Sequence, residues 1–219
     1  MRLAAIDIGS NAARLLITDV ITNPQGHAEF LKVALVRVPL RLGFDVFEKG
    51  EISASRAEKI LKTIKSYKLL LDVYEVEHIR ACATSAMRDA INAQVIIDRV
   101  KEETGITIEV ISGQEEASFI YENHVAESMN RDESYLYIDV GGGSTELTFF
   151  SDGKLVFKES FNIGTIRLLK NQVTEASWDE MKEFIRSRTK GHHKVTAIGS
   201  GGNINKVFSL SKRKEGKAL

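Results

Sequence analysis

One short pattern occurs twice in this chain of 219 residues, and it constrains the fold more than any other feature. Residues 5–11 read Ala-Ile-Asp-Ile-Gly-Ser-Asn, and residues 137–146 read Tyr-Ile-Asp-Val-Gly-Gly-Gly-Ser-Thr-Glu. Each copy is an apolar run that carries one aspartate, then a turn with glycine and hydroxyl residues, then a second apolar run. Such runs on either side of a turn predict strand, loop and strand. We therefore expect two units that each open on the same device.

Phosphate binding is the chemistry that suits this device. Glycines let the backbone turn tightly and approach a ligand closely, and successive N–H groups in such a turn form a concave anion site. The aspartates, Asp7 and Asp139, are expected to be buried; they repel phosphate and suit Mg²⁺ or its bound water. A plain β-hairpin remains the alternative for either copy alone. The expected phosphate-binding residues are Gly9, Ser10, Asn11, Gly141, Gly142, Gly143, Ser144 and Thr145.

A third glycine-rich turn follows a predicted strand at residues 195–198. Residues 197–203 read Ala-Ile-Gly-Ser-Gly-Gly-Asn, and a helix is predicted over 204–210. This strand, turn and helix can present the backbone N–H groups of Gly199, Ser200 and Gly201 to an anion, or lie against a nucleoside. Its spacing is not a dinucleotide fingerprint, and the chain has no Walker A lysine.

Two places supply candidate catalytic carboxylates. Glu115 and Glu116 open a helix predicted over 114–127, where acidic residues also favour the helix dipole. A carboxylate within hydrogen-bond reach of a water can accept its proton, so one of the pair is a candidate general base. Glu146 follows the second glycine loop and is a candidate for orienting the same water, or is simply a charged residue on an exposed strand position.

Arg88 lies in a predicted strand-to-helix junction, where Thr84 or Ser85 would cap the helix. Its guanidinium could grip phosphate with a planar fork of donors. A surface ion pair with Asp89 is the alternative, and it is the preferred interpretation from the residues alone. Arg14 and Arg167 leave the same two interpretations open.

Helical and strand patterns alternate along the rest of the chain, which predicts an α/β architecture. Helices are expected after the N-cap Ser53, over 92–103 with Gly105 as C-cap, and after Thr174. The polar residues 127–134 mark the expected boundary, giving domains 1–126 and 127–219. Further strands are expected near 3–8, 14–20, 29–38, 77–83, 107–111, 134–140, 147–150 and 154–162.

Four blocks of the chain resemble the signature sequences of exopolyphosphatases and guanosine pentaphosphate phosphohydrolases. The resemblance implies the actin-like (ribonuclease H-like) fold of sugar kinases and the heat-shock chaperone ATPase. That fold has two α/β domains, each with a mixed five-stranded sheet flanked by helices, around a phosphate-binding cleft. In chain order the blocks are Asp7-Ile-Gly-Ser-Asn11, Ala83-Thr-Ser-Ala-Met-Arg-Asp89, Val110-Ile-Ser-Gly-Gln-Glu-Glu-Ala117 and Asp139-Val-Gly-Gly-Gly-Ser-Thr-Glu-Leu147.

The same resemblance implies Mg²⁺-dependent hydrolysis of terminal phosphate from polyphosphate, or of guanosine pentaphosphate to the tetraphosphate. It assigns the catalytic base to Glu116 rather than Glu115, and the positioning of the attacking water to Glu146. Asp7 and Asp139 would face the metal. Ser10, Asn11, Arg88 and residues 141–144 would line the phosphate path.

The chain departs from the family pattern at three places. Ala12 and Ala13 stand where a hydroxyl residue is usual, and the third glycine turn differs from the usual Gly-Thr-Ser-Gly run. The chain also stops at Leu219, where relatives continue, so the second domain is expected to be incomplete. Two alternatives to the hydrolase stay open: an ATP-dependent phosphotransferase of the same fold, and a non-catalytic member that binds polyphosphate or an alarmone.

Composition bears on partners and location. Lys plus Arg and Asp plus Glu both count 30, so no global charge favours nucleic acid or an acidic membrane. Cys82 cannot form an internal disulfide, and it is expected to be a buried strand residue. No apolar stretch approaches the roughly 20 residues that span a bilayer, and the N-terminus does not resemble a signal peptide. We expect a cytoplasmic protein, with a homodimer left open.

Overall fold

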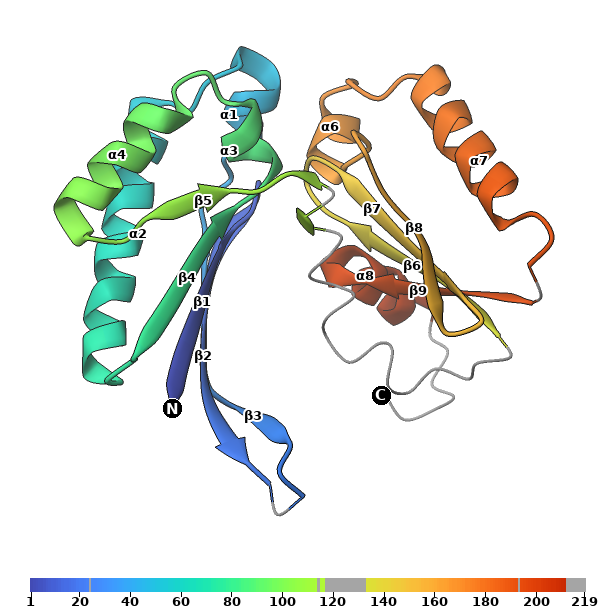
Figure 1. Ribbon diagram of the computed structural model, residues 1–219. Coiled ribbons are helices and arrows are strands. Elements are labelled where there is room, and N and C mark those ends of the chain that lie inside the picture. Colours follow the sequence, from blue (N-terminus) through green and yellow to red (C-terminus); the bar gives the residue numbers. More distant parts are fainter. Residues whose placement is uncertain (24, 114, 117–132, 193, 212–219) are drawn as a thin grey trace. The chain divides into compact units, whose positions relative to one another are not determined.

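The computed structural model describes residues 1–23, 25–113, 115–116, 133–192 and 194–211 (Figure 1). The chain divides into two compact units, Met1–Ser112 and Gly113–Leu219. The expected boundary at residues 126 and 127 lies outside the described residues, as does most of the helix expected over 114–127.

The first unit is built on a mixed sheet of five strands in the order β3-β2-β1-β4-β5. The first three strands are antiparallel neighbours, whereas β4 runs parallel to β1, and β5 runs parallel to β4. The carboxyl ends of β1, β4 and β5 therefore meet at one edge of the sheet. The strands are β1 (Arg2–Ile8), β2 (Ala12–Thr22), β3 (Ala28–Pro39), β4 (His78–Ala83) and β5 (Ile108–Val110).

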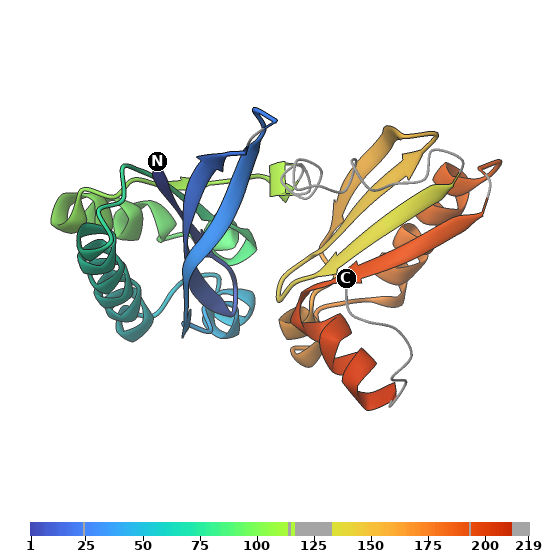
Figure 2. The ribbon, with the colours of Figure 1, turned by 90° about the horizontal axis from the view of Figure 1, so that it is seen from below.

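Apolar side chains at every second position hold this sheet against two helices. Ala4, Ile6 and Ile8 of β1 are buried, as expected for one face of a strand. Helices α2 (Ala54–Val73) and α4 (Ala93–Thr104) contact each other and cover this sheet (Figures 1 and 2). Their buried residues recur at three- and four-residue steps, the spacing of an amphipathic helix. Two short helices, α1 (Gly43–Lys49) and α3 (Ser85–Asp89), follow β3 and β4.

The second unit repeats the sheet with four strands in the order β8-β7-β6-β9. As in the first unit, three antiparallel strands are joined to a parallel strand beside the first of them. The strands are β6 (Ser134–Val140), β7 (Thr145–Ser151), β8 (Lys154–Phe161) and β9 (Val195–Ser200). The helices are α6 (Thr165–Leu169), α7 (Glu175–Thr189) and α8 (Gly201–Ser211). The described residues thus give this sheet one strand fewer than the expected five.

An aromatic cluster forms the core of the second unit. Phe149 of β7 is fully buried and stacks on Phe157 of β8, with 5.3 Å between the ring centroids. Phe184 of α7 meets Phe157 edge to face at 5.1 Å, a favoured geometry for aromatic pairs. These contacts fix α7 against β7 and β8.

Most sequence expectations for the fold are confirmed. The α/β class, the duplicated actin-like arrangement and the internal repeat are present, and Gly105 caps α4 in the left-handed region, with φ 75°. Two details differ. Cys82 lies in β4 but is only half-buried, because it faces away from α2 and α4. Ser53 stands at the N-cap of α2 without a side-chain capping bond, whereas Thr174 does cap α7. Within the described parts of the chain, no helix is long and apolar enough to cross a bilayer.

Tyr67 ties α2 to the sheet and provides a test of this packing. Its side chain is 1% exposed, and its hydroxyl donates a hydrogen bond to the carbonyl of Ala13 at 3.0 Å. Burial, and then the negative charge of Asp7, raise the pKa of Tyr67. We expect Tyr67→Phe to lower the free energy of unfolding by about 1 kcal/mol at neutral pH.

The pH dependence of this loss follows from the raised pKa. Above the unfolded-state value of 10.0, the unfolded chain releases the Tyr67 proton before the folded chain does, so wild-type stability falls as pH rises. We expect the difference in free energy of unfolding between wild type and Tyr67→Phe, measured by urea unfolding, to be smaller at about pH 10.5 than at about pH 8. A difference that is constant with pH would contradict this account, and Tyr74→Phe is the control.

Candidate functional site

The two copies of the repeat form the same turn. Strand pairing ends at Ile8 and Ala13 in the first unit and at Val140 and Thr145 in the second, which leaves four loop residues in each. The first loop residue donates its N–H to the carbonyl of the fourth, at 3.0 Å from Gly9 and 2.9 Å from Gly141. The expected strand–loop–strand device is therefore present twice.

Beside these loops, the two units differ in one cross-strand pair. In the first unit Asp7 lies opposite Arg14, and the two form an ion pair at 2.6 Å. In the second unit Asp139 lies opposite Glu146, at the same register position. Directly opposed residues share a face, with Cβ atoms about 5 Å apart. The first unit therefore neutralises its aspartate internally, whereas the second brings two carboxylates together.

Burial corrects two of the expectations for these residues. The Asp7 side chain is 45% exposed rather than buried, because it faces away from the helices that cover β1. Of the two interpretations of Arg14, the structure has the ion pair, which Arg14 makes with Asp7. Glu146, in contrast, is not an exposed strand residue, since it is only 3% exposed. A buried carboxylate requires hydrogen bonds or a cation, and the Ser160 hydroxyl donates to its Oε1 at 3.1 Å.

The first loop lies at the carboxyl edge of its sheet. Thr84, which follows β4, donates its N–H to the carbonyl of Ile8. The hydroxyls of Ser10 and Ser85 are 2.8 Å apart, and both side chains are buried. Neither Thr84 nor Ser85 caps α3 as expected: Thr84 stands at the N-cap without a side-chain bond, and the Ser85 hydroxyl is used to hold the loop.

The carbonyl groups of the first loop are held by the residues that follow β3. Gly43 donates its N–H to the carbonyl of Ser10 at 2.9 Å. Leu40 and Arg41 both donate to the carbonyl of Asn11, at 3.0 and 2.8 Å. Arg41 makes this contact with a φ of 59°, a region that non-glycine residues rarely adopt and that is enriched at functional sites.

The carbonyl groups of the second loop are held by the residues that follow β8. Thr165 donates its N–H to the carbonyl of Gly141 at 3.1 Å, and Ile166 donates to Gly142 at 2.8 Å. The carbonyl of Gly143 accepts a hydrogen bond from Nε of Arg167 at 2.7 Å. The Arg167 side chain therefore contacts the loop backbone directly, and it does not serve only in a surface ion pair.

The described part of the helix expected after residue 113 lies in the second unit, close to Glu146. Gly113 packs against Ser160, since a Cβ added at Gly113 would lie 2.6 Å from the Ser160 Oγ. Glu116 follows three residues later, about one helical turn along the chain. Glu115 is exposed, whereas Glu116 is partly buried with its Oε2 shielded from solvent. This difference favours Glu116 over Glu115 as a base in a water-poor site.

The remaining expected residues have structural contacts. Arg88 donates from its guanidinium to the carbonyl of Ile111 at 3.0 Å and lies 4.0 Å from Asp89, so it fixes the end of β5 that leads to the glutamates. Ser200 pairs with Asp139 at the end of β9, and α8 starts at Gly201. Gly199 packs on Ile204. The third glycine turn thus adjoins the second loop.

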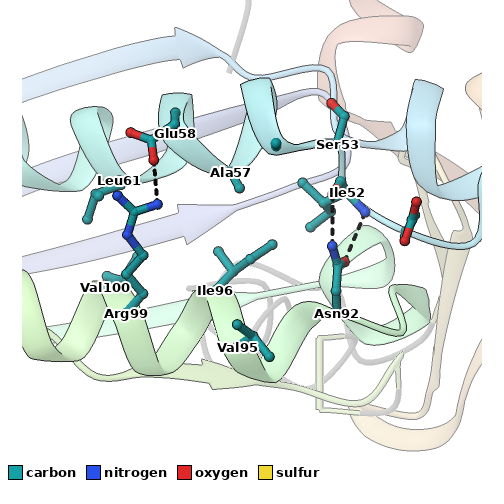
Figure 3. A pocket seen from close by; sticks show the side chains of 12 residues that line it. Ile52, Ser53, Ala57, Glu58, Leu61, Asn92, Val95, Ile96, Arg99 and Val100 are labelled. Carbon is teal, nitrogen blue, oxygen red and sulfur yellow. Dashed lines mark hydrogen bonds and ion pairs between the residues drawn. The ribbon is translucent and has the colours of Figure 1, made fainter.

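Two cavities lie outside the glycine loops. The first, of about 420 Å³, lies between α2 and α4 and is mostly apolar (Figure 3). Asn92 closes one end by bonding the backbone of Ile52, and the Arg99–Glu58 pair closes the other. The second, of about 430 Å³, lies between β8 and α7 beside Ser160 and carries Glu159 and Glu180. Neither suits a polyanion, since one is apolar and the other acidic.

Several contact residues were not expected from the sequence. They are Ser160, which bonds Glu146, and Gly164, Thr165, Ile166 and residues 40–43, which reach the glycine loops only through the fold. Arg167, in contrast, was named from the sequence, although its contact with the loop was not. One signal for the loop contacts was present: after the third strand of each unit, a glycine stands at or just before the start of a short helix, Gly43 at α1 and Gly164 before α6. Within the described residues, no group of three or more His, Cys, Asp or Glu side chains gathers as a metal site.

The sequence comparisons agree with this geometry. Residues 20–215 match the model of the Ppx/GppA phosphatase family. The chain belongs to this family. A bifunctional 3-dehydroquinate synthase/phosphatase of Fusobacterium nucleatum is 37% identical over 169 residues, covering 75% of the chain and 25% of that protein. Exopolyphosphatase 2 of Mycobacterium tuberculosis is 32% identical over 175 residues, covering 76% of the chain and 53% of that protein.

Solved structures of Ppx/GppA proteins share the fold. An exopolyphosphatase from Cytophaga hutchinsonii aligns with a TM-score of 0.78 and 29% identity, covering all of the chain and 73% of that structure. The Aquifex aeolicus family member aligns with a TM-score of 0.73 and 31% identity, covering all of the chain and 72% of that structure. The matched part of the chain spans about a quarter of the length of the first curated relative and about half of the length of the second.

Gly164 gives a direct test of the second loop in this Ppx/GppA chain. A Cβ at Gly164 would collide with the carbonyl oxygen of Gly142 and lie 2.5 Å from the Gly143 carbonyl carbon. Because these contacts are backbone, they cannot rotate away, and we expect Gly164→Ala to lower the free energy of unfolding by about 1–3 kcal/mol. The matched control is Gly202→Ala in α8, where a Cβ would meet nothing within 4 Å. Thermal unfolding of both should show Gly202→Ala unchanged or stabilised; equal stability of the two variants would contradict the packing.

Proposed function

We propose that this chain carries the catalytic residues of a phosphoanhydride hydrolase that releases the terminal phosphate of inorganic polyphosphate or guanosine pentaphosphate. Polyphosphate is the preferred substrate of the two, which the exopolyphosphatase relative supports. The observation that carries the proposal is the second loop beside a buried carboxylate. Within the described residues, the N–H groups of Gly142, Gly143 and Ser144 donate no hydrogen bond. The buried carboxylate is that of Glu146, two residues after Ser144.

The loop supplies the anion site. Three N–H groups on successive peptides bind phosphate oxygens without adding a counter-charge. Their positions are fixed before substrate arrives, because the carbonyls of the same segment are already bonded to residues 165–167. Such donors cost little reorganisation when charge builds on the transferred phosphoryl group.

The carboxylates supply the proton chemistry. A water that attacks phosphorus must lose a proton, and we assign its acceptance to Glu116. Glu146, which accepts a hydrogen bond from Ser160 and is almost wholly buried, is assigned the orienting of that water. Glu115 points to solvent and is not required.

Asp139 and Glu146 are the residues that would hold Mg²⁺. They lie opposite each other across β6 and β7, and two neighbouring carboxylates with phosphate oxygens and waters are the ligand set that Mg²⁺ takes in proteins. The ion would supply charge neutralisation on the phosphates. Asp7, which was expected to share this role, is instead neutralised by Arg14, and we assign it a supporting place beside the first loop.

Phosphate release is the test. Purified protein with Mg²⁺ is incubated with long-chain polyphosphate, guanosine pentaphosphate or ATP, and inorganic phosphate is followed. Glu116→Gln should lower the rate about 10²–10⁴-fold, because the amide cannot accept the proton, while Glu115→Gln, its matched neighbour, should keep wild-type activity. Glu146→Gln should lower the rate as well.

The outcomes separate the alternatives. Release that survives Glu116→Gln unchanged would refute the assigned base. Transfer of phosphate from ATP to an acceptor, with no release from the other two substrates, would indicate a phosphotransferase. Tight binding of tripolyphosphate without release would indicate a member that binds and does not turn over.

A further inference from the structure

Within the described residues, the three glycine carbonyls of the second loop are all held by one segment of the chain. Each of these carbonyls accepts a hydrogen bond from a successive residue of this segment, Gly164–Arg167. We infer that this bracing segment is the positioning element of the phosphate cradle, with Arg167 as a positioning residue. The inference rests on the proposed function, because it assigns a role in organising the same anion site.

Peptide geometry converts these three bonds into three oriented donors. In a trans peptide the carbonyl of one residue and the N–H of the next lie in one plane and point in opposite directions. Fixing the carbonyls of Gly141, Gly142 and Gly143 therefore aims the N–H groups of Gly142, Gly143 and Ser144 away from the bracing segment. Glycines rotate freely about their backbone angles, so these planes need external restraint more than other residues would.

The first two bonds use groups that a helix leaves unpaired. Helix α6 starts at Thr165, and the first N–H groups of a helix have no partner within it. Thr165 and Ile166 give theirs to the loop, whereas Leu168 already bonds within the helix, to the carbonyl of Gly164. The third carbonyl, that of Gly143, is instead held by the Arg167 side chain. Arg167 thus fixes one further peptide, the one between Gly143 and Ser144, and this peptide carries the Ser144 N–H.

The first unit contains the same device, which argues against coincidence. Leu40, Arg41 and Gly43 hold the carbonyls of Ser10 and Asn11, and they follow β3 as the bracing segment follows β8. There, however, all donors are backbone groups. The side-chain donor is specific to the second loop, which lies beside the carboxylate pair.

Three variants of Arg167 separate its hydrogen bond from its charge. Gln places an amide nitrogen at the same position along the side chain as Nε of Arg, so Arg167→Gln keeps the donor and loses the charge. Arg167→Lys keeps the charge and loses a donor at that position. Arg167→Met loses both while keeping the length. Arg186→Met, at an exposed arginine of α7, is the control.

Tripolyphosphate binding by titration calorimetry is the first readout. We expect Arg167→Met and Arg167→Lys to bind about tenfold more weakly, as for the loss of one hydrogen bond. Arg167→Gln and Arg186→Met should stay within about twofold of wild type. If Arg167→Lys binds like wild type and Arg167→Gln binds like Arg167→Met, the charge acts on the ligand and the inference is overturned. Equal binding by all variants overturns it too.

A second readout needs no ligand. In ¹H–¹⁵N spectra of the free protein, the Ser144 amide should move in Arg167→Met but return to its wild-type position in Arg167→Gln. Wild-type Arg167 should show a slowly exchanging Nε–H, and a fast one would overturn the inference even if Arg167→Met fails to fold. If wild type binds no tripolyphosphate but these signals behave as expected, the proposed function fails and the brace stands.

Discussion

The capture of loop carbonyls by the segment after the third strand is the interaction on which the site depends. A glycine turn between two strands has many backbone conformations, and only an external restraint selects one. In both units that restraint comes from the residues that follow the third antiparallel strand, β3 or β8. Because this strand runs back towards the loop, the residues after it lie beside the loop. The order of the strands therefore has a direct chemical consequence, because it places the brace against the loop.

The two copies of the framework differ in charge at one register position beside the loop. The residue opposite the aspartate that both copies carry is Arg14 in one unit and Glu146 in the other. The first pair satisfies itself at the surface, where an ion pair contributes little to stability. The second pair places two carboxyl groups opposite each other beside the second glycine loop, and two like charges at such a distance are costly unless a cation or a proton joins them. The two copies therefore differ in the charge that they place beside the loop, an internal ion pair in the first unit and two carboxyl groups in the second.

Much of this architecture could be predicted from local sequence. The Ala5–Asn11 and Tyr137–Glu146 copies, the Gly105 cap and the three-and-four spacing in α2 are short-range patterns, and each produced the expected element. The short helices α1 and α6 were not predicted, because five to seven residues carry too little periodicity. The fifth strand expected for the second sheet is absent from its described part.

The sequence by itself determined the fold class, the two glycine loops and the presence of carboxylates near them. Tertiary structure alone decided which carboxylates are buried or neutralised: Glu146 is enclosed while Asp7 is paired, although both were read from the same repeat. It also decided that Arg167 reaches the Gly143 carbonyl, 24 residues away, and that Ser10 meets Ser85, 75 residues away. Burial and hydrogen-bond partners depend on what the folded chain brings alongside a residue, and local sequence does not contain that information.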